Sequence, residues 1–325
     1  MRRSLILATL SVAFFTFSVF FTSPGHAFAQ LAPSLVTLLK APAFPAPHES
    51  VEVSLSDYAV DTVGADIFWY VDGAELPNTR NARSVIVTAG AIGETKTVRA
   101  DLVRKNAPTL SAATVIRPAV VDLVLEAATY VPDFYRGRAL PSDGAPIRAV
   151  AVVNDGTDAP ESSYTYKWSE SGDVLLGGPV KGKNVLDLTM TRYRKETLSV
   201  EVINDDGDTI GKRTIPLVSA EPTLIFYEHS PLRGLLERAM SDVNPLIGDE
   251  MTVYGEPYFL DARTTRNDGD FTWTIDGTEA PADGAPNALT LSKEGTTGSA
   301  SIDLRIVTKR AIPQLLRGGF TIFFD

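Results

Sequence analysis

Residues 67–73 read Ile-Phe-Trp-Tyr-Val-Asp-Gly, and this stretch decides the fold because its pattern occurs three times in the chain. Residues 164–172 read Tyr-Thr-Tyr-Lys-Trp-Ser-Glu-Ser-Gly, and residues 270–277 read Asp-Phe-Thr-Trp-Thr-Ile-Asp-Gly. In each copy, aromatic and β-branched residues alternate around a tryptophan and run into a polar residue and a glycine. This pattern is typical of a strand that enters a tight turn, so one strand-rich unit is predicted to occur three times.

The spacing of the tryptophans predicts the size of that unit. Trp69 and Trp168 are 99 residues apart, and Trp168 and Trp273 are 105 residues apart, which is about the length of one β-sandwich domain. Two sheets that face each other across ~10 Å leave a gap that an indole fills, so all three tryptophans are predicted core residues of an all-β fold. Further alternating stretches lie at residues 51–55, 84–88, 97–103, 147–153, 184–189, 198–203, 251–254, 287–292 and 300–307.

A resemblance to a known family enters with residues 198–207, Leu-Ser-Val-Glu-Val-Ile-Asn-Asp-Asp-Gly, which follow Tyr-Lys-Trp-Ser in the second unit. This run resembles the late strands and Asp/Gly hairpin of bacterial PKD and related immunoglobulin-like (Ig-like) modules. With residues 226–234, the order of segments is also similar to uncharacterised exported multi-Ig-like proteins of candidate-phylum bacteria. The resemblance implies three tandem Ig-like, PKD-like β-sandwiches and brings no activity with it. The chain has no cysteine, so it lacks the disulfide of antibody domains.

The first 29 residues are predicted to be a signal peptide. Arg2 and Arg3 precede an apolar run at residues 5–21, and Ala27-Phe28-Ala29 places small residues where a signal peptidase cleaves. Cleavage would leave Gln30 as the first residue of an exported protein, either secreted or associated with the cell surface. The alternative is an uncleaved anchor, in which residues 5–21 are the membrane contact.

Proline-rich and short polar segments suggest the boundaries between units. Residues 30–47 are expected to be a Pro-rich lead, in which residues 35–40 form either a first strand or a loose arm. Three Ig-like domains are expected to follow, at residues 48–118, 119–219 and 220–325. Because both junctions are brief, neighbouring domains are expected to form a semi-rigid rod.

One loop of the second domain is a candidate interaction loop. Tyr130, Phe134 and Tyr135 offer flat faces for a carbohydrate or a protein partner, beside the charges of Arg136 and Arg138. The alternative is that these aromatic side chains pack against the neighbouring domain.

Residues 232–240, Leu-Arg-Gly-Leu-Leu-Glu-Arg-Ala-Met, are predicted to form one short helix in the third domain. Ser230 would be its N-cap and Pro231 would occupy its first turn. The leucines fall on one face at helical spacing, so the helix is expected to cover an open edge of the sandwich, or else to bind a partner.

Composition and motifs exclude several functions. The 40 acidic and 30 basic residues give a formal net charge of −10, which disfavours nucleic acid as a partner. After the signal segment the chain has two histidines, His48 and His229, and none of the common hydrolase or nucleotide-binding motifs is present. No catalytic residue and no cofactor are therefore predicted. Pairs such as Asp205/Asp206 or Asp268/Asp270 could serve a glycosidase, but turns explain them more simply.

Calcium binding is a more serious chemical possibility than catalysis. Oxygen-bearing residues cluster at 154–161, 204–208 and 267–270, and calcium needs six or more oxygens. None of these clusters has EF-hand spacing, and each fits a hairpin turn equally well. The candidate calcium ligands are Asp155, Asp158, Asp205, Asp206 and Asp208.

These observations favour a non-enzymatic exported or cell-surface protein. Its Ig-like modules would act as a spacer and as a protein-interaction or adhesion surface, with a protein or glycan at the cell surface as partner. The alternative is a carbohydrate-binding protein or an assembly factor for surface polymers or pili.

Overall fold

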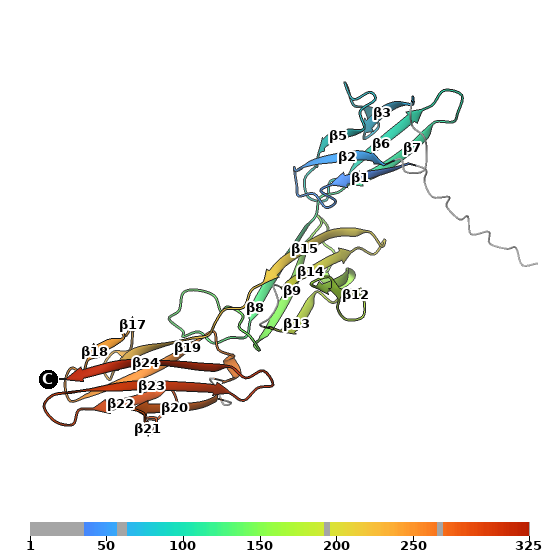
Figure 1. The fold of residues 1–325 in the computed structure, drawn as a ribbon. Coiled ribbons are helices and arrows are strands. Elements are labelled where there is room, and N and C mark those ends of the chain that lie inside the picture. Colours follow the sequence, from blue (N-terminus) through green and yellow to red (C-terminus); the bar gives the residue numbers. More distant parts are fainter. Residues whose placement is uncertain (1–35, 57–63, 192–195, 265–268, 325) are drawn as a thin grey trace, which may run out of the picture.

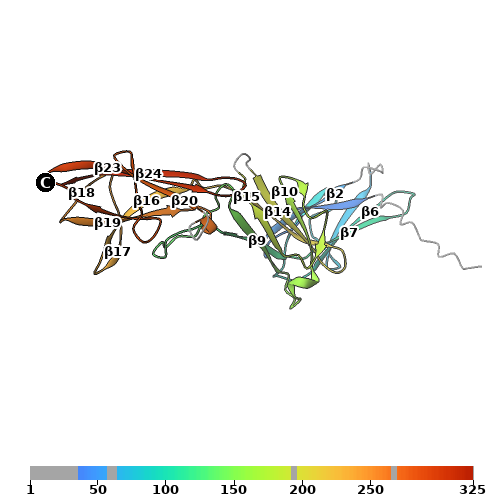
Figure 2. The same cartoon turned by 90° about the horizontal axis from the view of Figure 1, so that it is seen from below.

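The computed structural model describes residues 36–56, 64–191, 196–264 and 269–324. Within these residues the strands form six sheets, and buried apolar side chains form three hydrophobic clusters. Each cluster is enclosed by two of the sheets, and Figures 1 and 2 show these three sheet pairs following one another in a row. The predicted all-β fold is confirmed, whereas the predicted signal peptide lies outside the described residues.

The first sheet pair encloses the cluster around Trp69. One sheet has the order β1-β2-β5 and the other β4-β3-β6-β7. The strands are β1 (Thr37–Ala41), β2 (Ser50–Ser56), β3 (Asp66–Val71), β4 (Ala74–Glu75), β5 (Ser84–Thr88), β6 (Lys96–Val103) and β7 (Leu110–Ile116).

The second sheet pair encloses the cluster around Trp168. Its sheets have the orders β13-β9-β8 and β11-β10-β14-β15, and β12 also pairs with β10. The elements are β8 (Val120–Ala127), β9 (Pro146–Asn154), the 3₁₀ helix η1 (Glu161–Ser163), β10 (Thr165–Glu170), β11 (Asp173–Val174), β12 (Val180–Lys181), β13 (Val185–Thr189), β14 (Glu196–Ile203) and β15 (Thr209–Leu217).

The third sheet pair encloses the cluster around Trp273. Its sheets have the orders β17-β16-β19-β22 and β18-β24-β23-β20-β21. The strands are β16 (Thr223–Ser230), β17 (Gly234–Ala239), β18 (Val243–Pro245), β19 (Glu250–Tyr258), β20 (Gly269–Ile275), β21 (Thr278–Ala280), β22 (Ala288–Ser292), β23 (Gly298–Thr308) and β24 (Leu315–Phe324).

All three sheet pairs share one topology. The orders β1-β2-β5, β8-β9-β13 and β16-β19-β22 correspond, and so do β4-β3-β6-β7, β11-β10-β14-β15 and β21-β20-β23-β24. A strand that crosses from one sheet to the other after each hairpin is the Greek-key connectivity of Ig-like sandwiches. The repeated sequence pattern therefore corresponds to a repeated chain path.

Each tryptophan occupies the same position in its sheet pair. Trp69, Trp168 and Trp273 lie on β3, β10 and β20 and are 0%, 0% and 1% exposed. Their indole nitrogens donate to backbone carbonyls on the following segments, to Ala82 at 2.8 Å, Lys183 at 2.8 Å and Pro286 at 3.1 Å. Each indole thus fills the space between the sheets and keeps its single polar group bonded.

The tight turn that follows each tryptophan is clamped to a neighbouring strand. In the first sheet pair Asp72 and Gly73 have φ of 50° and 84°, the conformation of a two-residue hairpin turn. The amide of Asp72 donates to the carbonyl of Thr97 at 2.9 Å, and the amide of Thr97 donates to the Asp72 carboxylate at 2.8 Å. Asp276 and Ser301 repeat both bonds at 2.8 Å.

The short helix predicted for residues 232–240 is wrong, because Gly234–Ala239 form strand β17. The amide of Arg233 donates to Ser230 at 3.2 Å and closes a turn, and Gly234 then adopts a φ of 74°. Leu232, expected on the buried face, is 96% exposed at the turn. Helix propensity is worth less than ~1 kcal/mol per residue, and pairing with the edge of β16 overrides it.

The segment that was expected to be helical instead crosses between the two sheets. β17 pairs with β16, and β18 pairs in parallel with β24 of the facing sheet. The amide of Met240 donates to Phe226 at 2.8 Å and that of Leu246 donates to Phe323 at 2.8 Å. The segment therefore covers one side of the sandwich as two edge strands, which satisfies backbone groups that would otherwise be open.

The lead into the first sheet pair contains a strand, one of the two alternatives for residues 35–40. Thr37–Ala41 form β1 and pair with β2 along five residues. Val36 is 3% exposed and belongs to the first hydrophobic cluster.

Replacing Trp168 with alanine is expected to lower the free energy of unfolding of the second sheet pair by ~3–5 kcal/mol, because a large cavity replaces the indole. Trp168→Phe should cost less, since a six-membered ring remains and the cavity is smaller, although the bond to Lys183 is lost. Urea unfolding followed by the fluorescence of Trp69 and Trp273, beside circular dichroism, measures this. If the fluorescence transitions shift as far as the circular dichroism does, the three clusters do not unfold separately.

Candidate functional site

The candidate interaction loop lies against the third sheet pair. This loop connects β8 to β9, and Figure 1 shows it reaching toward β19. The amide of Tyr130 donates to Leu260 at 2.7 Å, and the amide of Phe259 donates back to Tyr130 at 2.7 Å. An isolated antiparallel bridge joins Thr129 to Asp261. The loop therefore adds a short piece of sheet pairing between the second and third sheet pairs.

The aromatic side chains of the loop contact aromatic side chains of the third sheet pair. The ring of Phe134 meets Tyr227 edge-on with centroids 5.2 Å apart, and Tyr135 meets Tyr258 in the same way at 5.4 Å. The hydroxyls of Tyr227 and Tyr258 lie 2.7 Å apart and share a hydrogen bond. Such edge-to-face pairs stabilise by about 0.5–1.5 kcal/mol each beyond burial.

A buried carboxylate fixes the third aromatic residue of the loop. The hydroxyl of Tyr130 donates to Oε2 of Glu256 at 2.5 Å, and Asn287 donates to Oε1 at 3.3 Å. Glu256 is 5% exposed. Burial raises the pKa of Glu256, the Tyr130 hydrogen bond opposes this, and the charge of Asp133 adds to the rise, so the net pKa lies above its ordinary value. Burial and Glu256 together raise the pKa of Tyr130.

A second buried polar group holds the other end of the loop. The side-chain amide of Gln314 donates to the hydroxyl of Ser142 at 2.9 Å and to the carbonyl of Asp143 at 2.5 Å, and its oxygen accepts from the amide of Asp261 at 3.0 Å. Ser142, Asp261 and Gln314 are 0%, 1% and 8% exposed. A buried polar group that loses its partner costs ~1–3 kcal/mol. These bonds therefore favour one orientation of the joint, the contact between the second and third sheet pairs.

Arg136 and Arg138 are placed differently from the aromatic residues of the loop. Both are exposed, whereas the rings of Phe134 and Tyr135 are engaged by Tyr227 and Tyr258. This loop therefore presents its two guanidinium groups to solvent, together with the exposed carboxylate of Asp133.

The carboxylates at residues 154–158 belong to a turn. Asp155 is 7% exposed and accepts from the amide and the hydroxyl of Thr157, at 3.0 and 2.6 Å. Burial raises its pKa, but the bonds from Thr157, with Tyr164 and the charge of Arg117, outweigh burial and hold the pKa below its ordinary value. Asp158 is exposed.

The carboxylates at residues 204–208 lie on the hairpin between β14 and β15. The side chain of Asn204 accepts from the amide of Asp208 at 2.8 Å, and the carboxylate of Asp205 pairs with Lys181 at 2.7 Å. Asp206 and Asp208 are exposed. Of the third predicted cluster, Asn267 and Asp268 lie outside the described residues, and Asp270 pairs with Lys309 at 2.6 Å.

The described part of the chain does not gather these carboxylates into a metal-binding cluster. Within residues 36–56, 64–191, 196–264 and 269–324, no three carboxylate or imidazole groups are placed to hold a metal ion. His48 is exposed, and the ring of His229 packs against Tyr254 with centroids 5.4 Å apart. In the same part of the chain no helix is long and apolar enough to cross a membrane.

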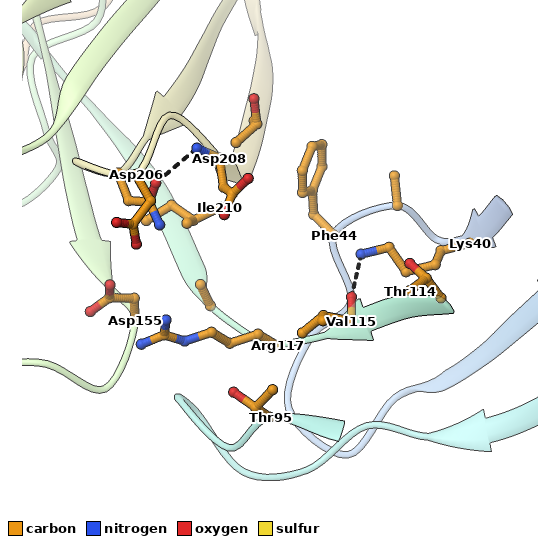
Figure 3. Close-up of a pocket in the computed structure, with 14 residues that line it drawn as sticks. Lys40, Phe44, Thr95, Thr114, Val115, Arg117, Asp155, Asp206, Asp208 and Ile210 are labelled. Carbon is orange, nitrogen blue, oxygen red and sulfur yellow. Dashed lines mark hydrogen bonds between the residues drawn. The ribbon is translucent and has the colours of Figure 1, made fainter. Parts of the chain in front are cut away.

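A cleft of about 460 Å³ lies between the first and second sheet pairs. Figure 3 shows Phe44 and Lys40 on one wall and Asp206 and Asp208 on the other, with Arg117 on the linker between them. The ammonium of Lys40 donates to the carbonyl of Val115 at 2.7 Å. Burial lowers the pKa of Lys40, and the nearby Asp208 carboxylate opposes this effect.

Beside the cleft, the backbone of the first sheet pair at Gly93 contacts that of the second at Gly156. The amide of Gly93 donates to Pro118 at 3.1 Å, and a Cβ built on Gly156 would lie 2.9 Å from Cα of Gly93. The φ values of Gly93 and Gly156 are 80° and 81°. A side chain at either position would therefore push the two sheet pairs apart.

Sequence reasoning missed four residues of these two joints. Lys40 and Phe44 stand in the stretch that was expected to be a Pro-rich lead, while Glu256 and Gln314 are polar residues within strand-like or loop stretches. Glu256 gave a usable signal, since it is a single acid within the otherwise apolar and aromatic run at residues 253–260. An isolated charge in such a run indicates a buried partner.

Comparisons with known proteins return structures of similar architecture. No family model matches the chain, and no curated protein matches it. Among solved structures, the three N-terminal domains of the highly immunogenic outer capsid protein of bacteriophage RB49 are 9% identical, with a TM-score of 0.26, covering 89% of this chain and 98% of that one.

Two further structures are also multi-domain proteins. The central fibronectin-III array of RIM-binding protein is 11% identical, with a TM-score of 0.27, and covers 86% of this chain and 94% of its own. The insect immune protein hemolin is 13% identical, with a TM-score of 0.23, and covers 89% and 77%. Because these TM-scores are low, the function proposed below rests on the contacts within this chain.

The carboxylates of Glu256 and Asp261, at the joint between the second and third sheet pairs, are expected to make the free energy of unfolding depend on pH in opposite directions. The raised pKa of Glu256 means that its contribution to stability is complete below the ordinary glutamate value of 4.5 and is lost as pH rises through the folded-state pKa. Relative to Glu256→Gln, the wild-type protein should therefore lose unfolding free energy as the pH rises from 4.5 through the raised folded-state pKa of Glu256. Urea unfolding at a series of pH values measures the difference.

Asp261 in the same joint provides the matched comparison. Burial raises its pKa, but its bonds to Arg263 outweigh burial and the net pKa is lowered. Its contribution is therefore present above the ordinary aspartate pKa and is lost as pH falls through the folded-state value. The wild-type advantage over Asp261→Asn should grow as pH rises, and slopes of the same sign for both variants would contradict the assignment.

Proposed function

We propose that this chain is a non-enzymatic exported or cell-surface protein whose three Ig-like domains form a spacer that carries an interaction surface. The domains are assigned to residues 48–118, 119–219 and 220–325, with β1 of the preceding lead added to the first sandwich. The observation that supports the spacer role best is the joint between the second and third sheet pairs.

This joint is held by three kinds of contact at once. Backbone bonds join Tyr130 to Leu260 and Phe259, aromatic rings of the loop meet those of the third sheet pair, and the polar groups of Glu256 and Gln314 are bonded across it. Linkers between independent domains are ordinarily exposed and crossed by few contacts. A joint with bonded buried polar groups instead resists rotation, because rotation would leave those groups unpaired.

The junction between the first and second sheet pairs supports the same role. Gly93 and Gly156 allow the two backbones to touch, and the linker at Pro118 accepts a bond from Gly93. A spacer needs its units at fixed separation, and contacts of this kind limit how far the units can bend.

The interaction surface is assigned to the exposed part of the loop after β8. Since Tyr130, Phe134 and Tyr135 serve the joint, the group offered to a partner is the arginine pair Arg136 and Arg138. On a chain of formal net charge −10, this pair is a local basic site. It would form bidentate bonds with carboxylates of a partner protein or glycan.

The spacer role is tested by a distance across the joint. The natural chain has no cysteine, so cysteines at the exposed positions Asp173 and Glu279 would carry a unique pair of spin labels. We expect one narrow distance distribution, which broadens when Tyr130→Ala and Gln314→Ala are combined because the polar bonds across the joint are removed. A broad distribution in the otherwise natural chain would overturn the spacer role.

The interaction surface is tested by partner recovery from the cell-surface material of the source organism. Arg136→Ser with Arg138→Ser should abolish recovery of a partner that the wild-type chain retains, while the joint distance stays unchanged. Arg233→Ser with Arg238→Ser is the matched control, since this exposed pair lies on the β16–β17 hairpin. Equal recovery by both double variants would discard the loop as the contact.

A further inference from the structure

Most residues that line the cleft between the first and second sheet pairs come from three segments that are far apart in the sequence. They are the lead at residues 40–44, the end of β7 with its linker at residues 114–119, and the β14–β15 hairpin at residues 204–210. Thr95 and Asp155 complete the lining. At about 460 Å³ the cleft falls within the usual range of ligand sites, ~300–1,000 Å³. It exists only where the two sheet pairs meet (Figure 3).

One wall presents an aromatic ring that the core does not use. Phe44 is 38% exposed, and it is absent from the first hydrophobic cluster. The backbone around it is anchored on both sides, because β1 pairs with β2 up to Ala41 and Pro45 is buried. The backbone on either side therefore holds the ring at the cleft.

The opposite wall presents two carboxylates that the hairpin does not need. The turn is closed by Asn204, whose side chain accepts from Asp208 N at 2.8 Å and whose carbonyl accepts from Gly207 at 3.1 Å. Asp205 points away to its ion pair with Lys181. Across the described parts of the chain, the carboxylates of Asp206 and Asp208 form no ion pair, and both line the cleft.

Two cations complete the cleft and limit what it can bind. Lys40 is bonded to Val115 and lies near Asp208, and Arg117 extends toward Asp155 (Figure 3). A strongly anionic ligand would meet the carboxylates, and a strongly cationic one would meet Lys40 and Arg117. A hydroxyl group suits both walls, because it donates to a carboxylate and accepts from an ammonium or guanidinium group.

We propose that this cleft binds a neutral oligosaccharide, with one sugar ring against the face of Phe44 and sugar hydroxyls donating to Asp206 and Asp208. The apolar C–H face of a sugar matches an aromatic ring that is exposed at a fixed position. The inference deepens the carbohydrate-binding alternative to the proposed function. It concerns a different surface from the Arg136 and Arg138 pair and does not depend on the spacer role.

The test is calorimetric titration of the purified chain with four neutral hexasaccharides. Two are glucose oligomers, one α-linked and one β-linked, and the others are oligomers of mannose and of N-acetylglucosamine. At least one should bind, and Phe44→Ala should weaken it about tenfold, which is about 1.4 kcal/mol. Asp206→Asn combined with Asp208→Asn should weaken it by a similar factor. Neither variant removes a bond of the turn, so their urea unfolding should match the wild-type protein.

Two controls separate this site from the rest of the surface. The first control is Asp205→Asn, because Asp205 lies on the same hairpin but pairs with Lys181. The second is Phe323→Ala, which removes an aromatic ring of similar exposure, 42%, in the third sheet pair. Both should bind the sugar as the wild-type protein does. Failure of all four sugars to bind, equal binding by the cleft variants, or binding of a hexalysine probe in place of the sugars would overturn the proposal. The spin-label distance would be unaffected by any of these outcomes.

Discussion

In each sheet pair a buried indole donates its N–H to a backbone carbonyl 13 or 15 residues further along the chain. This contact combines the two requirements of a small β-sandwich, which must fill the space between its layers and leave no buried polar group unpaired. The chain has no disulfide to replace it. The strands, the hairpin turns and the position of each sheet edge are all arranged around that central side chain.

The turn after each tryptophan extends this constraint to the next strand. Asp72 and Asp276 combine a left-handed backbone with a carboxylate that accepts from the neighbouring strand. In the second sheet pair Ser171 takes this place, and its hydroxyl accepts from Thr197 at the longer distance of 3.4 Å. The Asp-Gly or Ser-Gly pair therefore does more than reverse the chain, because it also sets the register of the sheet.

The two joints show different solutions to the same problem. Between the second and third sheet pairs, buried polar groups such as Glu256 and Gln314 are bonded across the contact, so orientation is set by hydrogen bonds. Between the first and second, Gly93 and Gly156 let the backbones meet and leave a charged cleft beside them. Polar residues therefore close the joint between the second and third sheet pairs, whereas they line an open cleft at the joint between the first and second.

The sequence by itself determined the repeated sandwich, because the alternation around Trp69, Trp168 and Trp273 and the turns that follow are local patterns. It could not decide between helix and strand at Gly234–Ala239, because the free edge of β16 that captures this segment is a long-range feature. It left open whether Tyr130 faces solvent or a neighbouring unit, since Glu256 is 126 residues away. The sequence could not predict the cleft lined by Phe44 and Asp206 either, because these residues are also far apart in the chain. Tertiary structure alone brings together groups that no local pattern connects.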